Sequence, residues 1–567
     1  MMQPATRISP CLAVLLCVVC TLNIQAQTQS NTRHQTTVPA SNSSHTGTVA
    51  NNQLATLIDA GKSLEIQGRW GEALSHYQQA LKVLPENQQI KTRRSISRIH
   101  YDLNRRYADS KYVKSLTGLN GNNSLKMYAE ILLKIQSYYV SRPDWDNILR
   151  HGLACMEIAL SDQNFVKHNL ANIDPREIQP AIDEMNSVLG KYDINTRQDA
   201  YLIANNVCRL MQRRLGLPIQ STVYEFTCGA IIALDPYSSF MTSNQYGETM
   251  SQIEGNFVGL GVELKTHADH LHIVNVIPKG PAGMAGLKSN DKIVSIDGNS
   301  VESLGGDVAA DELRGIEGSF VSLGVISETA KQATTIRLQR RRVEIPSVES
   351  VKIVDQQAGV GYLKLSNFQK TTVRDFDAAL WQLKNQGMRS LIVDVRGNPG
   401  GLLNSAVEIS DRFIHSGVIV STRGRNPLED YIHRAKQNGT WNLPLVVLID
   451  GDSASASEIF AAAIQDHRRG TVIGVQSYGK GSVQGIFQLN VGGGGVRLTT
   501  AKFYSPDGSP ISQVGVRPQV PVETVAKPTI EETASKETTK ASEVDDILRI
   551  GIITAKRQAS QTGYSRN

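Results

Sequence analysis

Three short apolar segments in the C-terminal half place the strongest constraint on how this chain folds. Each is rich in Leu, Ile or Val, and they are Leu391–Arg396, Leu445–Asp450 and Thr471–Val475. Apolar runs of this length are typical of parallel strands that are covered on both faces. Because helical patterns separate them, we expect an α/β core over residues 344–522.

The length of the chain predicts several structural units. At 567 residues it is too long for a single hydrophobic core. Its composition, 40% hydrophobic and 20% charged, is ordinary for a globular protein. The net charge of +6 is small for this length, and Lys and Arg are scattered along the chain. These features exclude a nucleic-acid-binding protein.

The N-terminus has the pattern of an export signal. Arg7 precedes the apolar run Leu12–Cys20, and a small residue, Ala26, follows. This order is typical of a secretory signal peptide, and the run is short for a membrane span. We therefore predict a signal peptide over residues 1–26 and a periplasmic or secreted protein, with membrane association left open. An uncleaved anchor or a buried strand is the alternative. Residues 27–50, rich in Gln, Ser, Thr and Asn, predict a flexible linker.

Two helical regions are expected before the middle of the chain. Residues 51–120 contain a tetratricopeptide-like helical hairpin, whose spacing is set by Trp70, Ala73, Tyr77, Ala80 and Pro85. A single unit of this kind must pack on the rest of the chain or bind a partner, and an ordinary hairpin is the alternative. Residues 121–245 predict further helices without candidate chemistry. An adaptor bound to the hairpin and a homo-oligomer are both compatible with these regions.

The cysteines do not indicate a metal site. Three of the six lie in the signal segment, and the other three, Cys155, Cys208 and Cys228, are isolated. Without a C-x-x-C pair or a neighbouring set of His ligands, no zinc site is expected, and no other metal or cofactor is implied. One disulfide with one thiol left over, or three buried thiols, both fit the sequence.

The pattern of residues 246–343 differs from the preceding helical pattern and predicts short strands separated by Gly and Asn or Asp turns. A glycine-rich segment is followed by Pro281–Leu287 (PAGMAGL) and then by Asp291–Gly298 (DKIVSIDG), and this order resembles a PDZ domain. A glycine turn exposes N–H groups that can hold the carboxylate of a peptide, and the next strand edge can pair with that peptide. The expected substrate-binding residues are Val258, Gly259, Leu260 and Gly261.

A serine lies where the second apolar strand gives way to a helix. Ser455 follows a turn of small residues, and the helix is expected to run from about Ser455 to His467. At this position unpaired N–H groups and the helix dipole can stabilise an oxyanion. The alternative is that Ser453 and Ser455 only cap the helix.

A nucleophilic serine needs a base. His467 is excluded because twelve helical residues separate it from Ser455, about 18 Å. Lys480 is the better candidate, since it lies in a Gly-Lys-Gly turn where burial can favour a neutral amine. The segment Gly474–Lys480 also matches a phosphate-binding loop, but Gly481 replaces the required Ser or Thr and a strand follows.

Residues 231–522 as a whole resemble the carboxyl-terminal processing peptidases, or tail-specific proteases, which are Ser/Lys serine peptidases with a PDZ domain. Gly397 and Asp452 depart from the usual residues of the family. Besides the PDZ segment, the motifs that carry the resemblance are Leu234–Phe240, Asp394–Gly401, Ser453–Ile459, Gly479–Gln484, Tyr504–Gly508 and Gly515–Pro518.

The resemblance implies a role for each site residue. Ser455 would be the nucleophile, Lys480 the general base and Gln484 the residue that orients the lysine. Backbone N–H groups of Ala456 and of the Gly400/Gly401 turn would form the oxyanion hole. The activity would be that of a serine endopeptidase that cleaves proteins or peptides with free C-termini through an acyl-enzyme. A non-catalytic PDZ and helical-repeat scaffold on the same fold is the alternative.

Taken together, the sequence predicts a multidomain α+β protein. It would have a helical N-terminal region, a PDZ β-barrel-like domain over residues 246–343 and an α/β peptidase core over residues 344–522. Residues 523–567 are expected to be a mobile tail with a short helix at Val544–Ala555, because they begin with a run rich in Glu, Thr and Lys.

Overall fold

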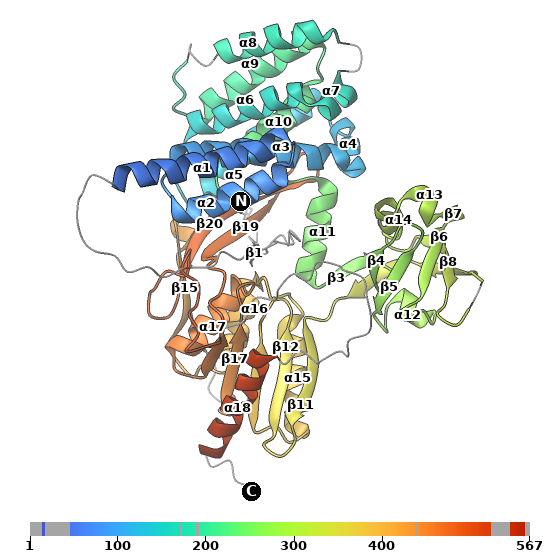
Figure 1. The fold of residues 1–567 in the computed structure, drawn as a ribbon, viewed down its shortest axis with the longest axis vertical. Coiled ribbons are helices and arrows are strands. Elements are labelled where there is room, and N and C mark those ends of the chain that lie inside the picture. Colours follow the sequence, from blue (N-terminus) through green and yellow to red (C-terminus); the bar gives the residue numbers. More distant parts are fainter. Residues whose placement is uncertain are drawn as a thin grey trace, which may run out of the picture.

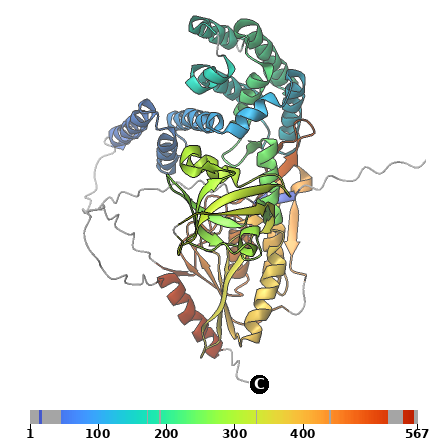
Figure 2. The same cartoon turned by 90° about the vertical axis from the view of Figure 1, so that its right-hand side faces the viewer.

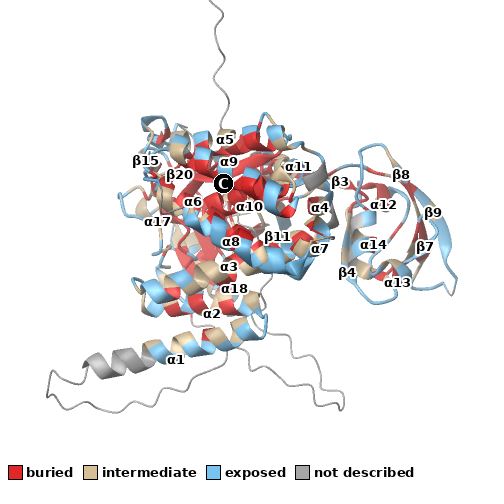
Figure 3. Ribbon diagram, turned by 90° about the horizontal axis from the view of Figure 1, so that it is seen from above, coloured by how far each residue is buried: buried red, intermediate tan, exposed pale blue. Residues whose placement is uncertain are grey.

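The computed structural model describes residues 14–17, 46–170, 173–188, 192–330, 332–436, 440–522 and 545–561. Within these ranges the chain forms a helical region, a small β domain that projects to one side, and a core of two sheets (Figures 1 and 3). This is the expected mixed helix-and-sheet architecture. The predicted signal peptide and linker lie outside the described residues except for β1 (Val14–Cys17) and the first turns of α1.

Ten α-helices make up the described part of the N-terminal region. They are α1 (Thr46–Ile66), α2 (Trp70–Val83), α3 (Gln88–Ala108), α4 (Ser110–Thr117), α5 (Gly121–Tyr138), α6 (Trp145–Ser161), α7 (Gln163–Asn169), α8 (Ile178–Ser187), α9 (Arg197–Leu215) and α10 (Ile219–Ile232). Helix α10 is the centre of this region, and its residues from Ser221 to Ile231 are all buried. A Cβ on Gly229 would lie 2.5 Å from the Cα of Gly152, so paired glycines allow α10 to approach α6 closely.

None of the helices in the described ranges has both the length and the apolar character needed to span a membrane. Cys155, Cys208 and Cys228 are all buried free thiols. Of the two arrangements that the sequence left open, the structure therefore contains the one with three buried thiols. The interpretation of α1 and α2 as a tetratricopeptide-like unit stays a prediction.

The small β domain is an antiparallel sheet in the order β4-β5-β6-β8-β9, and β7 pairs with β6. Its core contains Leu260, Ile273, Ile293 and Leu323. Helix α11 (Ser243–Glu254) and the pair β3–β10 connect it to the rest of the chain. Its elements are β3 (Asn256–Gly259), β4 (Val262–Thr266), β5 (Leu271–Val276), α12 (Pro281–Met284), β6 (Lys292–Ile296), β7 (Asn299–Ser300), α13 (Val301–Leu304), α14 (Gly306–Glu312), β8 (Phe320–Ile326), β9 (Thr334–Gln339) and β10 (Arg341–Glu344).

The first core sheet contains the three apolar segments as parallel strands, as predicted. Its order is β11-β12-β13-β17-β18-β21, and only the edge strand β11 is antiparallel. Its strands are β11 (Val348–Asp355), β12 (Val360–Leu365), β13 (Ser390–Asp394), β17 (Leu445–Ile449), β18 (Thr471–Gly474) and β21 (Val520–Pro521).

Helices cover both faces of this sheet. Leu391 and Val393 pack into a cluster with α15 (Thr372–Asn385), α16 (Leu403–Asp411) and α17 (Ala456–Asp466). Ile392, between them in the strand, packs instead with Ile547 and Ala555 of α18 (Asp546–Gln561). Figure 2 shows α18 in red and α15 in yellow on opposite sides of the strands. The burial of both faces explains why these strands are apolar throughout.

The second sheet joins the core to the helical region. Its centre is a β-hairpin, in which Gln488 of β19 faces Gly495 of β20. Phe487 and Leu498 of this hairpin belong to the same hydrophobic cluster as α5, α6 and α10. The sheet order is β14-β1-β19-β20-β15-β16, with β2 also paired to β20. Its strands besides β1 are β2 (Ser239–Met241), β14 (Gly401–Leu402), β15 (Val418–Gly424), β16 (Tyr431–Arg434), β19 (Ser482–Gln488) and β20 (Gly495–Tyr504).

Candidate active site

Ser455 is a strained and fully buried serine at the start of α17. Its φ and ψ are 60° and −111°, and the helix begins at the next residue, Ala456. A non-glycine residue with positive φ persists only where its surroundings hold it there, commonly at functional sites. Its side-chain hydroxyl has no hydrogen-bond partner among the described residues. A buried hydroxyl without a partner is rare in folded proteins and requires an explanation.

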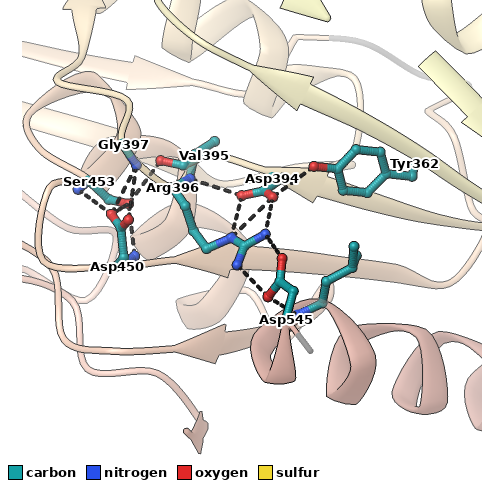
Figure 4. A network of polar contacts seen from close by, with 9 residues as sticks. Tyr362, Asp394, Val395, Arg396, Gly397, Asp450, Ser453 and Asp545 are labelled. Atoms are coloured by element: carbon teal, nitrogen blue, oxygen red, sulfur yellow. Dashed lines mark hydrogen bonds and ion pairs between the residues drawn. The ribbon is translucent and has the colours of Figure 1, made fainter. Parts of the chain in front are cut away.

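The turn before Ser455 is fixed by Asp450. This carboxylate accepts hydrogen bonds from the main-chain nitrogens of Gly397 at 3.0 Å, Asp452 at 3.1 Å and Ser453 at 2.9 Å. The Ser453 hydroxyl donates to the carbonyl of Val395 at 2.8 Å, which ties the turn to the end of β13 (Figure 4). Ser453 is therefore a structural residue of the turn.

Glu458 joins the serine segment to the lysine segment. Its Oε2 accepts hydrogen bonds from the main-chain nitrogens of Ser455 at 2.7 Å and Lys480 at 2.9 Å. Its Oε1 accepts from the Gly479 nitrogen and the Ser477 hydroxyl, both at 2.6 Å. Burial raises the pKa of Glu458, and these hydrogen bonds oppose that rise. The sequence alone did not indicate a role for Glu458 in the site, although a Glu three residues after a Ser at a helix start is the signature of a capping box.

Lys480 is buried, with 2% of its surface exposed. Its Nζ lies 5.1 Å from the ring centroid of Tyr237, in the segment before β2. Burial raises the pKa of Tyr237 to about 12. Gly481 is needed after the lysine, because a Cβ there would lie 2.1 Å from the Ser512 nitrogen. The segment after α10 thus places an aromatic ring beside the buried lysine. The sequence alone did not indicate this contact.

Gln484 is buried on β19, four residues after Lys480. Its Nε2 donates to the Ser482 hydroxyl at 2.9 Å, and its Oε1 has no hydrogen-bond partner among the described residues. The expected hydrogen bonds from Ser455 to Lys480 and from Lys480 to Gln484 are therefore not formed in this conformation. The structure brings the three chain segments together, and the contact between their reactive atoms stays a prediction.

A glycine turn, Gly397–Gly401, packs directly on the serine. A Cβ on Gly400 would lie 2.8 Å from the Ser455 Cβ and 2.9 Å from the Ala456 nitrogen, so only glycine fits there. The Gly400 N–H donates to Asn398 Oδ1 at 2.8 Å. The Gly400 amide is therefore engaged in this conformation, and its role as an oxyanion donor stays a prediction. The other two predicted donors are Gly401 and Ala456, whose N–H has no intrahelical acceptor.

Asn398 fastens the glycine turn to its neighbours. Its Nδ2 donates to the Leu365 carbonyl at 2.7 Å. Its own carbonyl accepts from the Ala454 nitrogen at 3.1 Å and from the Ser457 hydroxyl at 2.9 Å. The turn and the nucleophile segment therefore form one buried, hydrogen-bonded unit.

The expected peptide-binding loop lies apart from Ser455, in the small β domain. Val258 and Gly259 belong to β3, which pairs with β10, while Leu260 is buried and Gly261 has a φ of 81°. The following strand, β4, is the end strand of its sheet. An end strand has one unpaired edge, which is the feature that strand addition of a peptide requires.

The sequence matches two known families. Residues 359–522 match peptidase family S41, and residues 258–338 match the PDZ domain. A carboxy-terminal-processing protease of Bartonella bacilliformis is 38% identical over 300 residues, which cover 52% of this chain and 68% of that protein. A carboxyl-terminal-processing protease of Synechocystis sp. is 32% identical over 332 residues, which cover 58% of this chain and 76% of that protein.

A solved structure, the photosystem II D1 C-terminal processing protease, aligns with 70% of this chain and 93% of its own. The two are 23% identical, and the TM-score is 0.36. The family assignment depends on the sequence matches alone. The chain belongs to the carboxyl-terminal-processing protease family, the S41 serine peptidases, and carries a PDZ domain before its peptidase core.

Proposed function

We propose that this protein is a serine endopeptidase that cleaves substrates near their C-termini, with Ser455 as nucleophile and Lys480 as general base. One observation carries the proposal. A single buried carboxylate oxygen, Oε2 of Glu458, accepts the main-chain N–H groups of both residues. A strained serine and a buried lysine that share one acceptor are expected to act together.

The chemistry follows from the two side chains. Neutral Lys480 takes the proton of the Ser455 hydroxyl while Oγ bonds to the carbonyl carbon of the scissile peptide. The ammonium then gives the proton to the leaving nitrogen, the C–N bond breaks, and an acyl ester remains on Ser455. Water that loses a proton to Lys480 hydrolyses the ester and regenerates the hydroxyl. The N–H groups of Ala456 and Gly401 would stabilise the oxyanion.

The scheme requires a change from the described conformation, since the Ser455 hydroxyl has no partner there. We expect rotation of the lysine side chain between staggered rotamers to bring the amine to the hydroxyl, because Glu458 binds the main chain of both residues. Gln484 would then accept a hydrogen bond from the lysine and hold the new rotamer.

Two features support binding of an extended polypeptide. Strand β1 lies between β14 and β19, and Leu16 faces both Leu402 and Gln484. A substrate strand in the same place would run antiparallel to both neighbours and pass beside the glycine turn. In the PDZ domain, the Val258–Gly261 loop and the edge of β4 would hold the free C-terminus of the substrate. Export of the enzyme through residues 1–26 is part of the same proposal.

The proposal is tested with an unfolded protein that has an apolar C-terminal tail. The expected result is cleavage near that tail, read by mass spectrometry, and its loss in both Ser455→Ala and Lys480→Ala. Lys502→Ala, on the exposed side of β20, is the matched lysine control and should cleave normally. Truncation of the tail should raise KM. Cleavage by Ser455→Ala at the wild-type rate would contradict the mechanism, and tail-dependent binding without any cleavage would support the scaffold alternative.

A further inference from the structure

The C-terminal helix α18 is attached to the strand that leads into the glycine turn. It buries Ile547, Gly551 and Ala555 against the face of the parallel sheet opposite α15–α17. A Cβ on Gly551 would lie 3.0 Å from Leu448 Cδ2, so the helix is closely packed on β17. In Figure 1 this helix, in red, lies over the parallel sheet near β17.

Arg396 is the link between the helix and the active-site strand. It follows β13 by two residues, and its guanidinium binds two carboxylates at once (Figure 4). Nε donates to Asp394 Oδ1 at 2.9 Å and Nη2 to Oδ2 at 2.6 Å. Nη1 donates to Asp545 Oδ1 at 2.7 Å and Nη2 to Oδ2 at 2.8 Å. Bidentate pairs of this kind fix both the position and the plane of the guanidinium.

The Asp394 half of this network is buried, and several donors bind its carboxylate. Asp394 is almost inaccessible, and it also accepts hydrogen bonds from the Tyr362 hydroxyl at 2.9 Å and from the Arg396 nitrogen at 3.0 Å. The arginine is 19% exposed and Asp545 43% exposed, so the helix contributes the outer half of the network. Arg396 therefore connects the start of α18, through Asp545, to the buried carboxylate of Asp394.

Asp545 has a second role at the start of α18. Its Oδ1 accepts the Leu548 nitrogen at 3.0 Å, and its carbonyl accepts the Arg549 nitrogen at 2.8 Å. The hydrogen bond from Arg396 lowers the pKa of this carboxyl. One carboxylate thus caps the first turn of α18 and binds Arg396, so the order of that turn and the orientation of the arginine are coupled.

The residues after Arg396 lead directly to the nucleophile. The next nitrogen, of Gly397, donates to Asp450, which holds the turn before Ser455. Asn398 and Gly400 follow, and both contact the serine segment as described above. A shift of Arg396 would therefore move the turn that supplies the Gly401 oxyanion donor.

We propose that Asp545 is a positioning residue, and that the docked α18 helix holds the glycine turn in the geometry that the peptidase site needs. As far as catalysis is concerned, this inference rests on the proposed function. It makes the C-terminal segment of the chain a part of the active-site support. The observation that supports the proposal is that Asp394 and Asp545 both bind the guanidinium of Arg396.

The test uses the full chain and two carboxylate variants. Asp545→Asn keeps a residue that caps helices well but removes the charge that binds Arg396. Asp355→Asn is the matched control, because Asp355 binds Lys556 of the same helix at 2.7 Å but far along the chain from the glycine turn. Thermal unfolding of each variant, with Asp545→Glu as the conservative rescue, shows whether the fold is kept.

Hydrogen exchange provides a readout that does not need activity. In Asp545→Asn, amides of residues 397–402 should exchange several-fold faster than in the wild type, while Asp355→Asn leaves them unchanged. Equal exchange in the wild type and Asp545→Asn would overturn the proposal. This comparison tests whether Asp545 affects the glycine turn even if the wild-type protein has no peptidase activity. In that case only the proposed function fails.

Kinetics then test the catalytic part. Removing a single oxyanion donor typically lowers kcat about 10²–10³-fold, so a displaced turn is expected to lower it about tenfold with KM unchanged. Asp545→Glu should recover most of that loss. In an Arg396→Gln background, Asp545→Asn should add no further loss. Faster exchange with an unchanged kcat in an active enzyme would overturn the role of Asp545 in catalysis.

Discussion

Oε2 of Glu458 accepts the main-chain N–H of Lys480 at 2.9 Å, and the same atom accepts the N–H of Ser455. The side chain that closes the first turn of α17 is thus also the acceptor for the lysine turn. A carboxylate is suited to this position because it has only acceptors, and all four of its hydrogen-bond partners here are donors.

Glu458→Gln is therefore expected to damage the site although its shape is nearly unchanged. The amide nitrogen would face donors that it cannot accept, and each unpaired buried group costs about 1–3 kcal/mol. We expect kcat to fall at least about tenfold and the melting temperature to fall as well. Steady-state kinetics and thermal unfolding measure the two effects. Glu429→Gln, which replaces another buried carboxylate that binds the Thr500 hydroxyl, is the control for activity, and equal kcat in both variants would contradict the role of Glu458.

The sequence predicted the parts of this fold that depend on local pattern. The apolar runs predicted the parallel strands, and the turn of small residues placed Ser455 at the start of a helix. The ion pair between Arg396 and Asp545 was not predictable in this way, because it joins residues 149 positions apart and the motif that contains Arg396 does not indicate its partner. The same holds for Tyr237 beside Lys480, whose contact depends on how the helical region packs on the core.

The Gly400 amide shows a second limit of prediction from the sequence. The motif led us to expect a donor at Gly400 or Gly401, but the side chain of Asn398, two residues earlier, accepts the Gly400 N–H. The direction of a main-chain N–H in a turn is set by its dihedral angles, which the residue types alone do not determine. The motif therefore indicates the turn but not which of its two amides already has an acceptor.

Gly400 and Gly397, both in the glycine turn, should respond very differently to substitution. Gly400 has a φ of 108° and no room for a Cβ, whereas Gly397 has a φ of 68° and open space around it. Gly400→Ala should lower kcat at least about 10²-fold, because the methyl group displaces the serine turn. Gly397→Asn should keep most of the activity, since Asn tolerates the left-handed region. A Gly400→Ala enzyme as active as Gly397→Asn would exclude the close packing described here.

Tyr237 is expected to shape the lysine pocket through its ring. The centroid of its ring lies 5.1 Å from Lys480 Nζ, within the range of a cation–π contact. Tyr237→Phe keeps that ring and should retain kcat/KM within about threefold. Tyr237→Ala opens the pocket and should lower kcat/KM at least about tenfold, in line with the cost of losing a preorganised, desolvated site. A larger loss in the Phe variant than in the Ala variant would show that the hydroxyl, and not the ring, is what matters.

Glu429 should give the folded protein a pH-dependent loss of stability. Burial raises its pKa above the ordinary value, while a hydrogen bond from the Thr500 hydroxyl at 3.2 Å opposes the rise. Because the folded chain then holds the proton more tightly than the unfolded chain, the contribution of this group to stability is present below its unfolded pKa, about 4.3, and is lost as pH rises through the folded pKa. Glu429→Gln cannot ionise, so its melting temperature relative to the wild type should increase between pH 4 and pH 7. The difference is measured by thermal unfolding in matched buffers, and a difference that shrinks as pH rises would show that Glu429 is stabilised as the carboxylate instead.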